Sequence, residues 1–492
     1  MQGSCEFPQG GSGRPSQVRT AALALLAMAS AWAGGCAPQA PPPAQDLLLI
    51  SVDTLRADVL GLYGCDRGAS PRLDAWGRGA ALFLDAFTHS PKTAPSHMSL
   101  FTGLLPHEHG VSNLDSRGAP RLADDQPLLA ELLSGQGFRT AAVTGGGNVR
   151  AQLGFDRGFA EYHDRGDGLD EALKRATQWL QRDRSSGGRW FHFLHTYQVH
   201  DPYINGARFL TRFTDPAYAG RILGDPEALG RAILGGADLA PKASGGAKLT
   251  GNFWRRVDER DPRDQRHLFD LYLAGVAQMD DLLGGWLERL EKRGWLDRAL
   301  VVLTSDHGEE FAEHGGLRHD QMYSEVARVP LLVRHPSGAG AGQRLPGLVG
   351  HRDVLPSVLE LLGLSGLTPA EAAGRSWARA LLGLEALPAG GPLWSMHQTD
   401  RDGPLDALFV RTPDLAWFQA PGRLEFYDRR ADPGELRPLP ADHPASAAQA
   451  AEAAATFLGF QRLAQAAPGQ LQSLDEATRS DLKALGYLDP DE

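Results

Sequence analysis

The sequence predicts an α/β fold in which buried strands alternate with helices. Residues 47–51 (LLLIS) form a continuous apolar run of strand length, and polar residues follow it directly from Asp53. A second apolar run, ALVVLTS, is followed in the same way by Asp306 and His307. Open α/β sheets bind ligands at the carboxyl ends of their strands. Both polar clusters are therefore candidates for a functional site.

Further strand and helix patterns lie between and beyond these two clusters. Strands are expected at 81–89, 138–143 and 190–195, at VPLLV and in the two apolar runs above; helices are expected at 70–80, 127–134 and 169–181, in the amphipathic stretch LFDLYLAGVAQMDDLLGGWLERLEKRG and at HRDVLPSVLELLGL. Residues 205–260 have weak periodicity and frequent Gly, Pro and Asp. Such a stretch is typical of an insertion or lid that shapes substrate choice.

The pattern changes beyond about residue 374. The short runs LWSMHQ, DALFVRT, LAWFQA and RLEFYD, separated by turn residues, predict a small antiparallel sheet. An Ala-rich helix is expected near 445–466, and the final LDEATRSDLKALGYL has the spacing of a short amphipathic helix. We therefore expect a C-terminal subdomain over 374–492.

Composition restricts the class of protein. A chain of 492 residues with 42% hydrophobic residues is long enough for a large and a small domain. Its formal net charge of −11 argues against a nucleic-acid-binding protein, because such proteins usually carry a basic face.

The N-terminus has the pattern of a targeting segment. Arg14 and Arg19 precede an apolar stretch at 21–33 that is too short to span a bilayer, and small residues then lead to Cys36. We predict a lipoprotein signal over 1–36, with a lipid on Cys36 and a Pro-rich linker over 37–45. A plain secretory signal cut nearby is the alternative. Both alternatives predict an exported bacterial protein. It would be periplasmic, or a lipoprotein of the outer membrane or cell surface.

Two further motifs carry candidate functional groups. In SPKTAPSHMSLFTGL, Thr93 and Pro95 have the pattern of a helix start, where free amide groups suit an anionic substrate and a deprotonated hydroxyl. Read alone, Thr93 is more typical of a helix cap. In HTYQVHDPY, three polar groups gather at one strand end: His195, His200 and Asp201. A histidine within a strand is often simply packed, so His200 in the loop is the better candidate.

The order of these motifs resembles the sulfatase family of the alkaline phosphatase superfamily, over residues 46–488. The resemblance is carried by SVDTLRADVLGLYG, TAPSHMSLFTGLLPHEHG, HDPY, QMDDLLGGWLERLEKRGWLDRALVVLTSDHGEEFAEHG, RVPLLV, RDVLPSVLELLG and LEFYDRRADPGE. It implies a central mixed sheet flanked by helices, with a catalytic domain over 46–373 and the small sheet after it. It also implies metal-dependent hydrolysis of sulfate or phosphate esters.

The resemblance assigns roles to individual residues. It implies one divalent ion (Ca²⁺, Mn²⁺, Zn²⁺ or Mg²⁺) held by Asp53, Asp306, His307 and Thr93, with Thr93 also the nucleophile. Esters of this kind need a nucleophile, a cation and a proton source for the leaving oxygen, which agrees with these residue types. His200 and His319 match positions that bind the transferred group or protonate the leaving oxygen, and Lys92 and His97 flank the nucleophile as candidate substrate ligands. A second ion involving His314 and Asp201 is left open.

The nucleophile departs from the family pattern. Sulfatases of the main type resemble C-x-P-S-R or S-x-P-S-R, in which Cys or Ser becomes formylglycine, whereas residues 93–97 read TAPSH. Threonine is not a precursor of that aldehyde. Thr nucleophiles resemble the phosphodiesterases and the phosphoethanolamine or phosphoglycerol transferases of the superfamily, which favours a phosphoester modestly. Two alternatives to hydrolysis are a phospho-headgroup transferase and a non-catalytic binding protein on the same fold.

Overall fold

The computed structural model describes residues 40–111, 119–225, 227–228, 253–388, 390–399, 403–466 and 470–472. The predicted signal segment with Cys36, the centre of the predicted insertion and the predicted C-terminal amphipathic helix lie outside these residues. Among the described residues, no helix combines the length and the apolar character needed to cross a bilayer.

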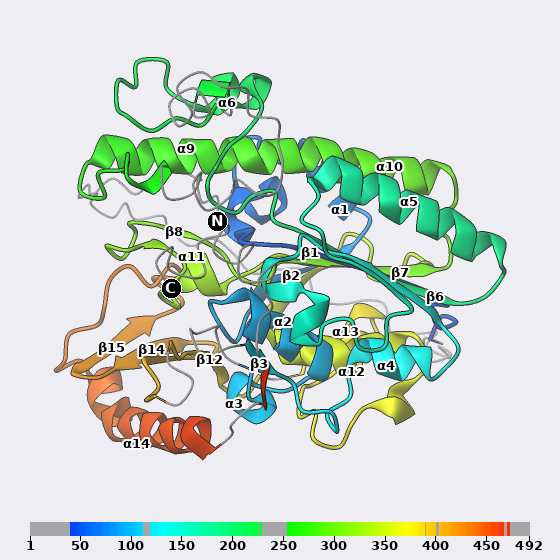
Figure 1. Ribbon diagram of the computed structural model, residues 1–492. Coiled ribbons are helices and arrows are strands. Elements are labelled where there is room, and N and C mark those ends of the chain that lie inside the picture. The colour runs from blue at the N-terminus through cyan, green and yellow to red at the C-terminus, as the bar shows by residue number, and fades with distance from the viewer. Residues whose placement is uncertain are drawn as a thin grey trace, which may run out of the picture.

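An eight-stranded sheet forms the centre of the molecule, in the order β11-β2-β10-β7-β1-β6-β4-β5 (Figure 1). Its strands are β1 (Asp46–Val52), β2 (Ala81–Phe87), β4 (Arg139–Val143), β5 (Glu161–His163), β6 (Trp190–Thr196), β7 (Ala299–Thr304), β10 (Leu331–Arg334) and β11 (Arg344–Gly350). Only β10 within this sheet runs antiparallel to its neighbours, β2 and β7. The predicted mixed sheet is confirmed.

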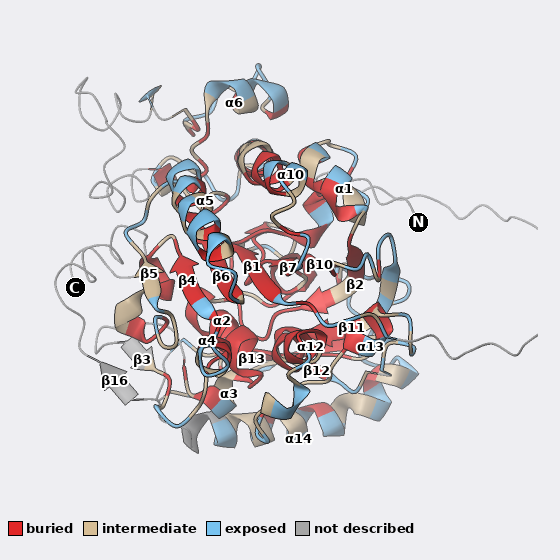
Figure 2. Ribbon diagram, turned by 90° about the vertical axis from the view of Figure 1, so that its right-hand side faces the viewer, coloured by how far each residue is buried: buried red, intermediate tan, exposed pale blue. Residues whose placement is uncertain are grey.

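Helices cover both faces of this sheet (Figures 1 and 2). The first face carries α1 (Pro71–Gly77), α5 (Leu169–Ser185), α9 (Pro262–Met279) and α10 (Gly285–Lys292); the other carries α2 (Thr93–Thr102), α4 (Leu129–Ser134), α12 (Val354–Leu361) and α13 (Ala378–Leu381). Strand β1 contributes side chains to the hydrophobic cores on both faces of the sheet. Leu48 and Ile50 pack in the core beneath the first set of helices, and Leu47 and Leu49 pack in the core beneath the other set. Each such buried side chain contributes about 1.5–3 kcal/mol.

Shorter elements surround this core. A π-helical turn (Asp280–Gly284) joins α9 to α10, and α6 (Ala207–Phe213), within the predicted insertion, packs on α9. Other short elements are α3 (Pro106–His109), α11 (Ser324–Ala327), the pair β8 (Glu310–Phe311) and β9 (Leu317–Arg318), and β3 (Ala119–Arg121), which pairs with β16 (Gln470–Gln472) from the C-terminal part of the chain.

A separate four-stranded antiparallel sheet follows, as predicted. It consists of β12 (Leu393–His397), β13 (Ala407–Arg411), β14 (Leu415–Ala420) and β15 (Arg423–Asp428), and α14 (Pro444–Ala466) packs against it. Strand β12 also bonds to the loop before α2: Ser395 Oγ donates to the Thr88 carbonyl (2.6 Å), and the Met396 amide donates to the His89 carbonyl (2.9 Å). The small sheet therefore supports the loop that leads to Thr93.

Candidate active site

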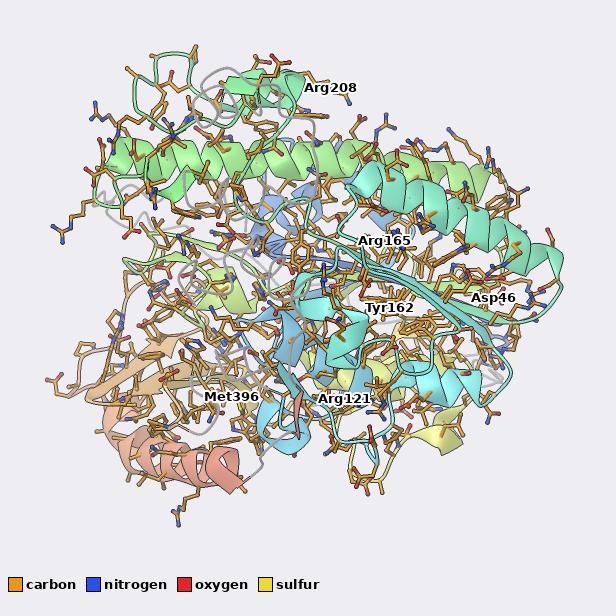
Figure 3. The ribbon with its side chains drawn as sticks, viewed as in Figure 1. Asp46, Arg121, Tyr162, Arg165, Arg208 and Met396 are labelled. Atoms are coloured by element: carbon orange, nitrogen blue, oxygen red, sulfur yellow. The ribbon has the colours of Figure 1, made fainter. Side chains whose placement is uncertain are left out.

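The carboxyl ends of three parallel strands meet at one edge of the central sheet. Ser51 of β1 pairs with His195 of β6 on one side and with Thr304 of β7 on the other. The polar residues after each strand are thereby brought together, at the end of β1 opposite to Asp46, which Figure 3 labels. The sequence clusters at Asp53 and at Asp306 therefore belong to one site.

Three buried ligand atoms face one another at this edge. Oδ1 of Asp53, Oδ2 of Asp306 and Nε2 of His307 have no hydrogen-bond partner, and the three side chains offer ligand atoms within 4.8 Å of one another. The Nδ1–H of His307 donates to the Gly308 carbonyl (3.0 Å), which leaves the lone pair of Nε2 directed away from that bond. Buried polar atoms are normally paired, so this set fits a bound cation.

The charges of this set support the same conclusion. Burial and the neighbouring Asp306 carboxylate raise the pKa of Asp53 well above its ordinary value, because two buried negative charges repel each other. A bound divalent cation would compensate this repulsion, and two carboxylates with one imidazole are ligands that such ions accept.

Thr93 lies at this cluster, as the first residue of α2. Its hydroxyl donates to Oδ2 of Asp53 (3.2 Å), and the residue is only 1% exposed. The side chain therefore occupies the positive end of the helix macrodipole, where a developing negative charge is stabilised.

His97 lies one turn further along α2 and is fully buried. Its Nδ1 is 2.8 Å from the Thr93 carbonyl oxygen, and its Nε2 is 3.0 Å from Oγ of Ser51. Burial lowers the pKa of His97, so the ring is neutral, donating from one nitrogen and accepting at the other. His97 therefore ties the Thr93 turn to β1, and its predicted contact with the substrate stays a prediction.

His200 and His319 lie beside the cluster. Nε2 of His200 is 4.0 Å from Oδ1 of Asp53, and its Nδ1 is 2.8 Å from Oδ1 of Asp201. Burial opposes protonation of His200, but the charge and hydrogen bond of Asp201 outweigh it and raise the His200 pKa to about 10. The ring of His319 lies with its centroid 5.6 Å from that of His200 and 4.5 Å from that of His307.

The environment gives the two histidines opposite protonation states. Burial, together with the nearby charges of His307 and Lys92, lowers the pKa of His319 well below its ordinary value. His200 therefore carries a proton at neutral pH and His319 does not. Lys92 itself forms an ion pair with Asp320 (2.5 Å) and is partly exposed.

Two residues of the site were not among the predicted site residues. Nε2 of His195 is 3.4 Å from Oδ2 of Asp53, and His195 is fully buried; its place within a strand had suggested simple packing. Glu309 is buried with its Oε1 3.9 Å from Nδ1 of His319, and burial and Asp201 raise its pKa to about 8. Its position two residues after His307 was the available signal.

His314 has two protein partners. Its Nδ1 is 2.6 Å from Oε1 of Glu325, and its Nε2 is 2.7 Å from the Glu435 carbonyl oxygen. The Nε2 contact links His314 to the C-terminal part of the chain. Glu310, His314 and Glu325 also offer ligand atoms within 4.8 Å of one another, so a second ion at His314 stays a prediction.

The profile of the sulfatase family matches residues 45–364, which contain every predicted site residue. This chain belongs to the sulfatase family. The protein is thus an ester hydrolase of that family, as the motifs had predicted. The mixed sheet, its flanking helices and the small C-terminal sheet match the solved structures of the family.

Relatives of this sulfatase-family chain are distant. An N-acetylglucosamine-6-O-sulfatase of Bacteroides thetaiotaomicron is 22% identical over 489 residues, covering 84% of this chain and 86% of the relative. A choline-sulfatase of Rhizobium meliloti is 24% identical over 382 residues, covering 65% and 68%. The phosphonate monoester hydrolase of Agrobacterium radiobacter superposes with a TM-score of 0.65 at 18% identity, covering 85% of this chain and 96% of that one. This structural likeness shows the shared fold.

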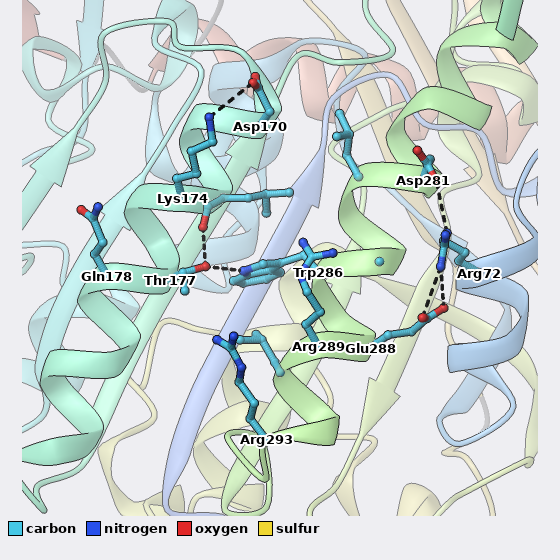
Figure 4. Close-up of a pocket in the computed structure, with 14 residues that line it drawn as sticks. Arg72, Asp170, Lys174, Thr177, Gln178, Asp281, Trp286, Glu288, Arg289 and Arg293 are labelled. Atoms are coloured by element: carbon cyan, nitrogen blue, oxygen red, sulfur yellow. Dashed lines mark hydrogen bonds and ion pairs between the residues drawn. The ribbon is translucent and has the colours of Figure 1, made fainter. Parts of the chain in front are cut away.

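A cavity of about 730 Å³ lies away from the sulfatase-family site, between α5 and α10 (Figure 4). It is lined in part by Arg72, Lys174, Asp281, Trp286, Glu288 and Arg293. Arg72 pairs with Asp281 and Glu288 within the cavity wall. None of the predicted site residues lines it.

Proposed function

We propose that this sulfatase-family protein hydrolyses a sulfate or phosphate ester in two steps, through a covalent intermediate on Thr93. The observation that carries the proposal is the hydroxyl of Thr93, 3.2 Å from Asp53, at a helix start beside three buried ligand atoms. A hydroxyl nucleophile, a cation site and protonatable imidazoles are the groups that this reaction needs.

Asp53, Asp306 and His307 would hold the divalent cation, with the oxygen of Thr93 as a fourth ligand. When bound, the ion supplies positive charge that lowers the pKa of the Thr93 hydroxyl and neutralises the transferred group. The residue types accept Ca²⁺, Mn²⁺, Zn²⁺ or Mg²⁺, so a metal titration decides its identity.

The side chains act in sequence. The Thr93 hydroxyl loses its proton to solvent, and its oxygen forms a bond to sulfur or phosphorus while the bond from that atom to the leaving-group oxygen breaks. Protonated His200 gives its proton to the leaving oxygen and later takes up another from solvent. His319, which is neutral, then accepts a proton from water as the water oxygen bonds to sulfur or phosphorus and the bond to Thr93 breaks; His319 passes this proton to the released Thr93 oxygen. His97 holds the Thr93 turn in place, and Lys92 attracts the anionic group.

Both ester classes have support. Named relatives include sulfatases, and a structural neighbour is a phosphonate monoester hydrolase. A threonine in place of the formylglycine precursor favours a phosphate ester over a sulfate ester as the substrate. The reason is that the ester formed on threonine can be removed only by attack of water on the transferred atom.

The test uses purified protein with each of the four metal ions. We expect cleavage of aryl phosphodiesters or aryl sulfates, and loss of cleavage in Thr93→Ala. Thr102→Ala is the matched control, because Thr102 is a buried threonine of the same helix whose hydroxyl bonds to the Met98 carbonyl. Transfer of the group to an added alcohol in preference to water would favour the transferase alternative. A wild-type protein as inert as Thr93→Ala across the panel would favour a binding protein.

We also propose export and a lipid anchor on Cys36, with the linker over 37–45, the catalytic domain over 46–373 and the C-terminal subdomain over 374–492. The support is the pattern of the N-terminal sequence. Cys36→Ala should release the protein from the membrane fraction. An equal distribution of wild type and variant between membrane and soluble fractions would argue for a plain secretory signal.

A further inference from the structure

An arginine stacked on a tryptophan lies at the rim of the site. The guanidinium carbon of Arg318 is 4.1 Å from the ring centroid of Trp254, and both side chains are partly exposed. Arg318 directly precedes His319, and Trp254 comes from the end of the insertion. Two segments far apart in the sequence therefore meet beside a histidine of the proposed mechanism.

Trp254 is fixed to the catalytic residues. Its Nε1–H donates to Oδ2 of Asp201, whose other oxygen is 2.8 Å from Nδ1 of His200. Its neighbour Phe253 is fully buried, and its ring centroid lies 5.9 Å from that of Tyr203. The indole is consequently a rigid platform for the guanidinium.

The charge of Arg318 is left available. Among the described residues its guanidinium makes no hydrogen bond or ion pair, and its field reaches the carboxyls of Asp201, Glu309 and Asp320. Two of these already have a cationic partner: Asp201 pairs with His200, and Asp320 with Lys92. A flat guanidinium held on a ring offers several N–H donors to an anion.

The backbone at this position supports a functional role. Arg318 has φ +72°, in the left-handed region that non-glycine residues rarely adopt. The fold therefore holds Arg318 in a conformation that local preference disfavours, and this conformation presents its side chain to Trp254.

We propose that Arg318 and Trp254 form a subsite for a second anionic group, carried by the leaving-group part of the substrate. This inference rests on the proposed function, since it assumes that an ester is bound with its leaving group toward the neighbouring rings of His200 and His319. The substrate class is then an ester of an alcohol that bears a further carboxylate, sulfate or phosphate.

The test compares two substrates: a 4-nitrophenyl ester and the same ester with a carboxylate on the ring. Their ratio of kcat/KM is measured for wild type and Arg318→Gln, so that the intrinsic reactivity of each leaving group cancels. We expect the preference for the carboxylated ester to fall about tenfold in Arg318→Gln, and by less in Arg318→Lys. Trp254→Ala should also lower it. Arg293→Gln is the matched control, because Arg293 stacks on Trp295 at 5.3 Å outside the site.

An unchanged ratio in Arg318→Gln, including equal losses of kcat/KM on both esters, would overturn the subsite. A binding measurement separates this failure from failure of the proposed function. Calorimetric titration with the carboxylated nitrophenol should show tighter binding to wild type than to Arg318→Gln, whether or not any ester is cleaved. Equal affinity of the two proteins would contradict the inference even in an active enzyme.

Discussion

The hydroxyl of Thr93 donates a hydrogen bond to Oδ2 of Asp53 across 3.2 Å, although the two residues are forty positions apart in the chain. One belongs to the start of α2 and the other to the loop after β1. This contact places the proposed nucleophile directly at the proposed cation site, and the first prediction follows from it.

Thr93→Ala should lower kcat by about 10³-fold or more, because the covalent route is removed. Thr93→Ser should keep a measurable part of the activity, since it retains the hydroxyl. Circular dichroism and thermal unfolding of both variants should resemble wild type. Comparable kcat values for wild type and Thr93→Ala would rule out the threonine intermediate.

Asp53→Asn should stabilise the metal-free protein while abolishing its response to metal. The substitution removes one of two buried carboxylates whose negative charges repel each other, so the free energy of unfolding of the metal-free protein should rise. In wild type, a divalent ion at 100 times its Kd should add about 2.7 kcal/mol.

Urea unfolding with and without the ion measures both effects of Asp53→Asn. Asp46→Asn is a suitable control, since Asp46 is a buried aspartate at the opposite end of the same strand. A metal response that survives in Asp53→Asn, or is lost in Asp46→Asn, would place the ion elsewhere.

His97→Ala should lower the free energy of unfolding by about 2–4 kcal/mol, because a buried ring and two hydrogen bonds are lost. Ser51→Ala removes only one of these bonds and should cost about 1 kcal/mol. If His97 only positions Thr93, kcat should fall in His97→Ala with little change in KM. A large rise in KM at constant kcat would instead support the direct substrate contact that we first predicted.

His109 should make the protein less stable in acid. Burial lowers its pKa to about 3, whereas in the unfolded chain its pKa is near 6.5. Below pH 6.5 the unfolded state therefore binds a proton that the folded state excludes, and stability falls as the pH falls toward 3. For one such histidine, the free energy of unfolding changes by up to about 1.4 kcal/mol per pH unit.

Urea unfolding at several pH values between about 4.5 and 6, which lie between the folded and unfolded pKa values of His109, measures this effect. His109→Gln should show a shallower dependence of the free energy of unfolding on pH than wild type, by the contribution of one proton. Parallel curves for the two proteins would mean that His109 is charged in the folded state.

Much of this fold follows from sequence pattern, for identifiable reasons. Strands β1, β6 and β7 are buried on both faces and have continuous apolar runs, and β12 to β15 lie between clear turn signals. Strand β11 was not predicted, because RLPGLVG contains both Pro and Gly and lies at the sheet edge. The antiparallel direction of β10 is set by tertiary packing and leaves no mark in its periodicity.

The place of the candidate site could be predicted from the sequence, and its details less so. Aspartates and a histidine after buried strands indicated where polar side chains meet, because strand ends meet in parallel sheets. His97 could not be placed, since helix spacing alone does not tell which face of α2 meets β1. His195 resembled a packed strand residue, and only the register Ser51 to His195 brings it to Asp53.

The most direct measurement is mass spectrometry of the protein quenched during turnover of an aryl phosphodiester or aryl sulfate. We expect one phosphoryl or sulfuryl group on the peptide that contains Thr93, absent from Thr93→Ala and lost again when the substrate is exhausted. Rapid turnover with an unmodified Thr93 peptide, or with the group on another residue, would contradict it.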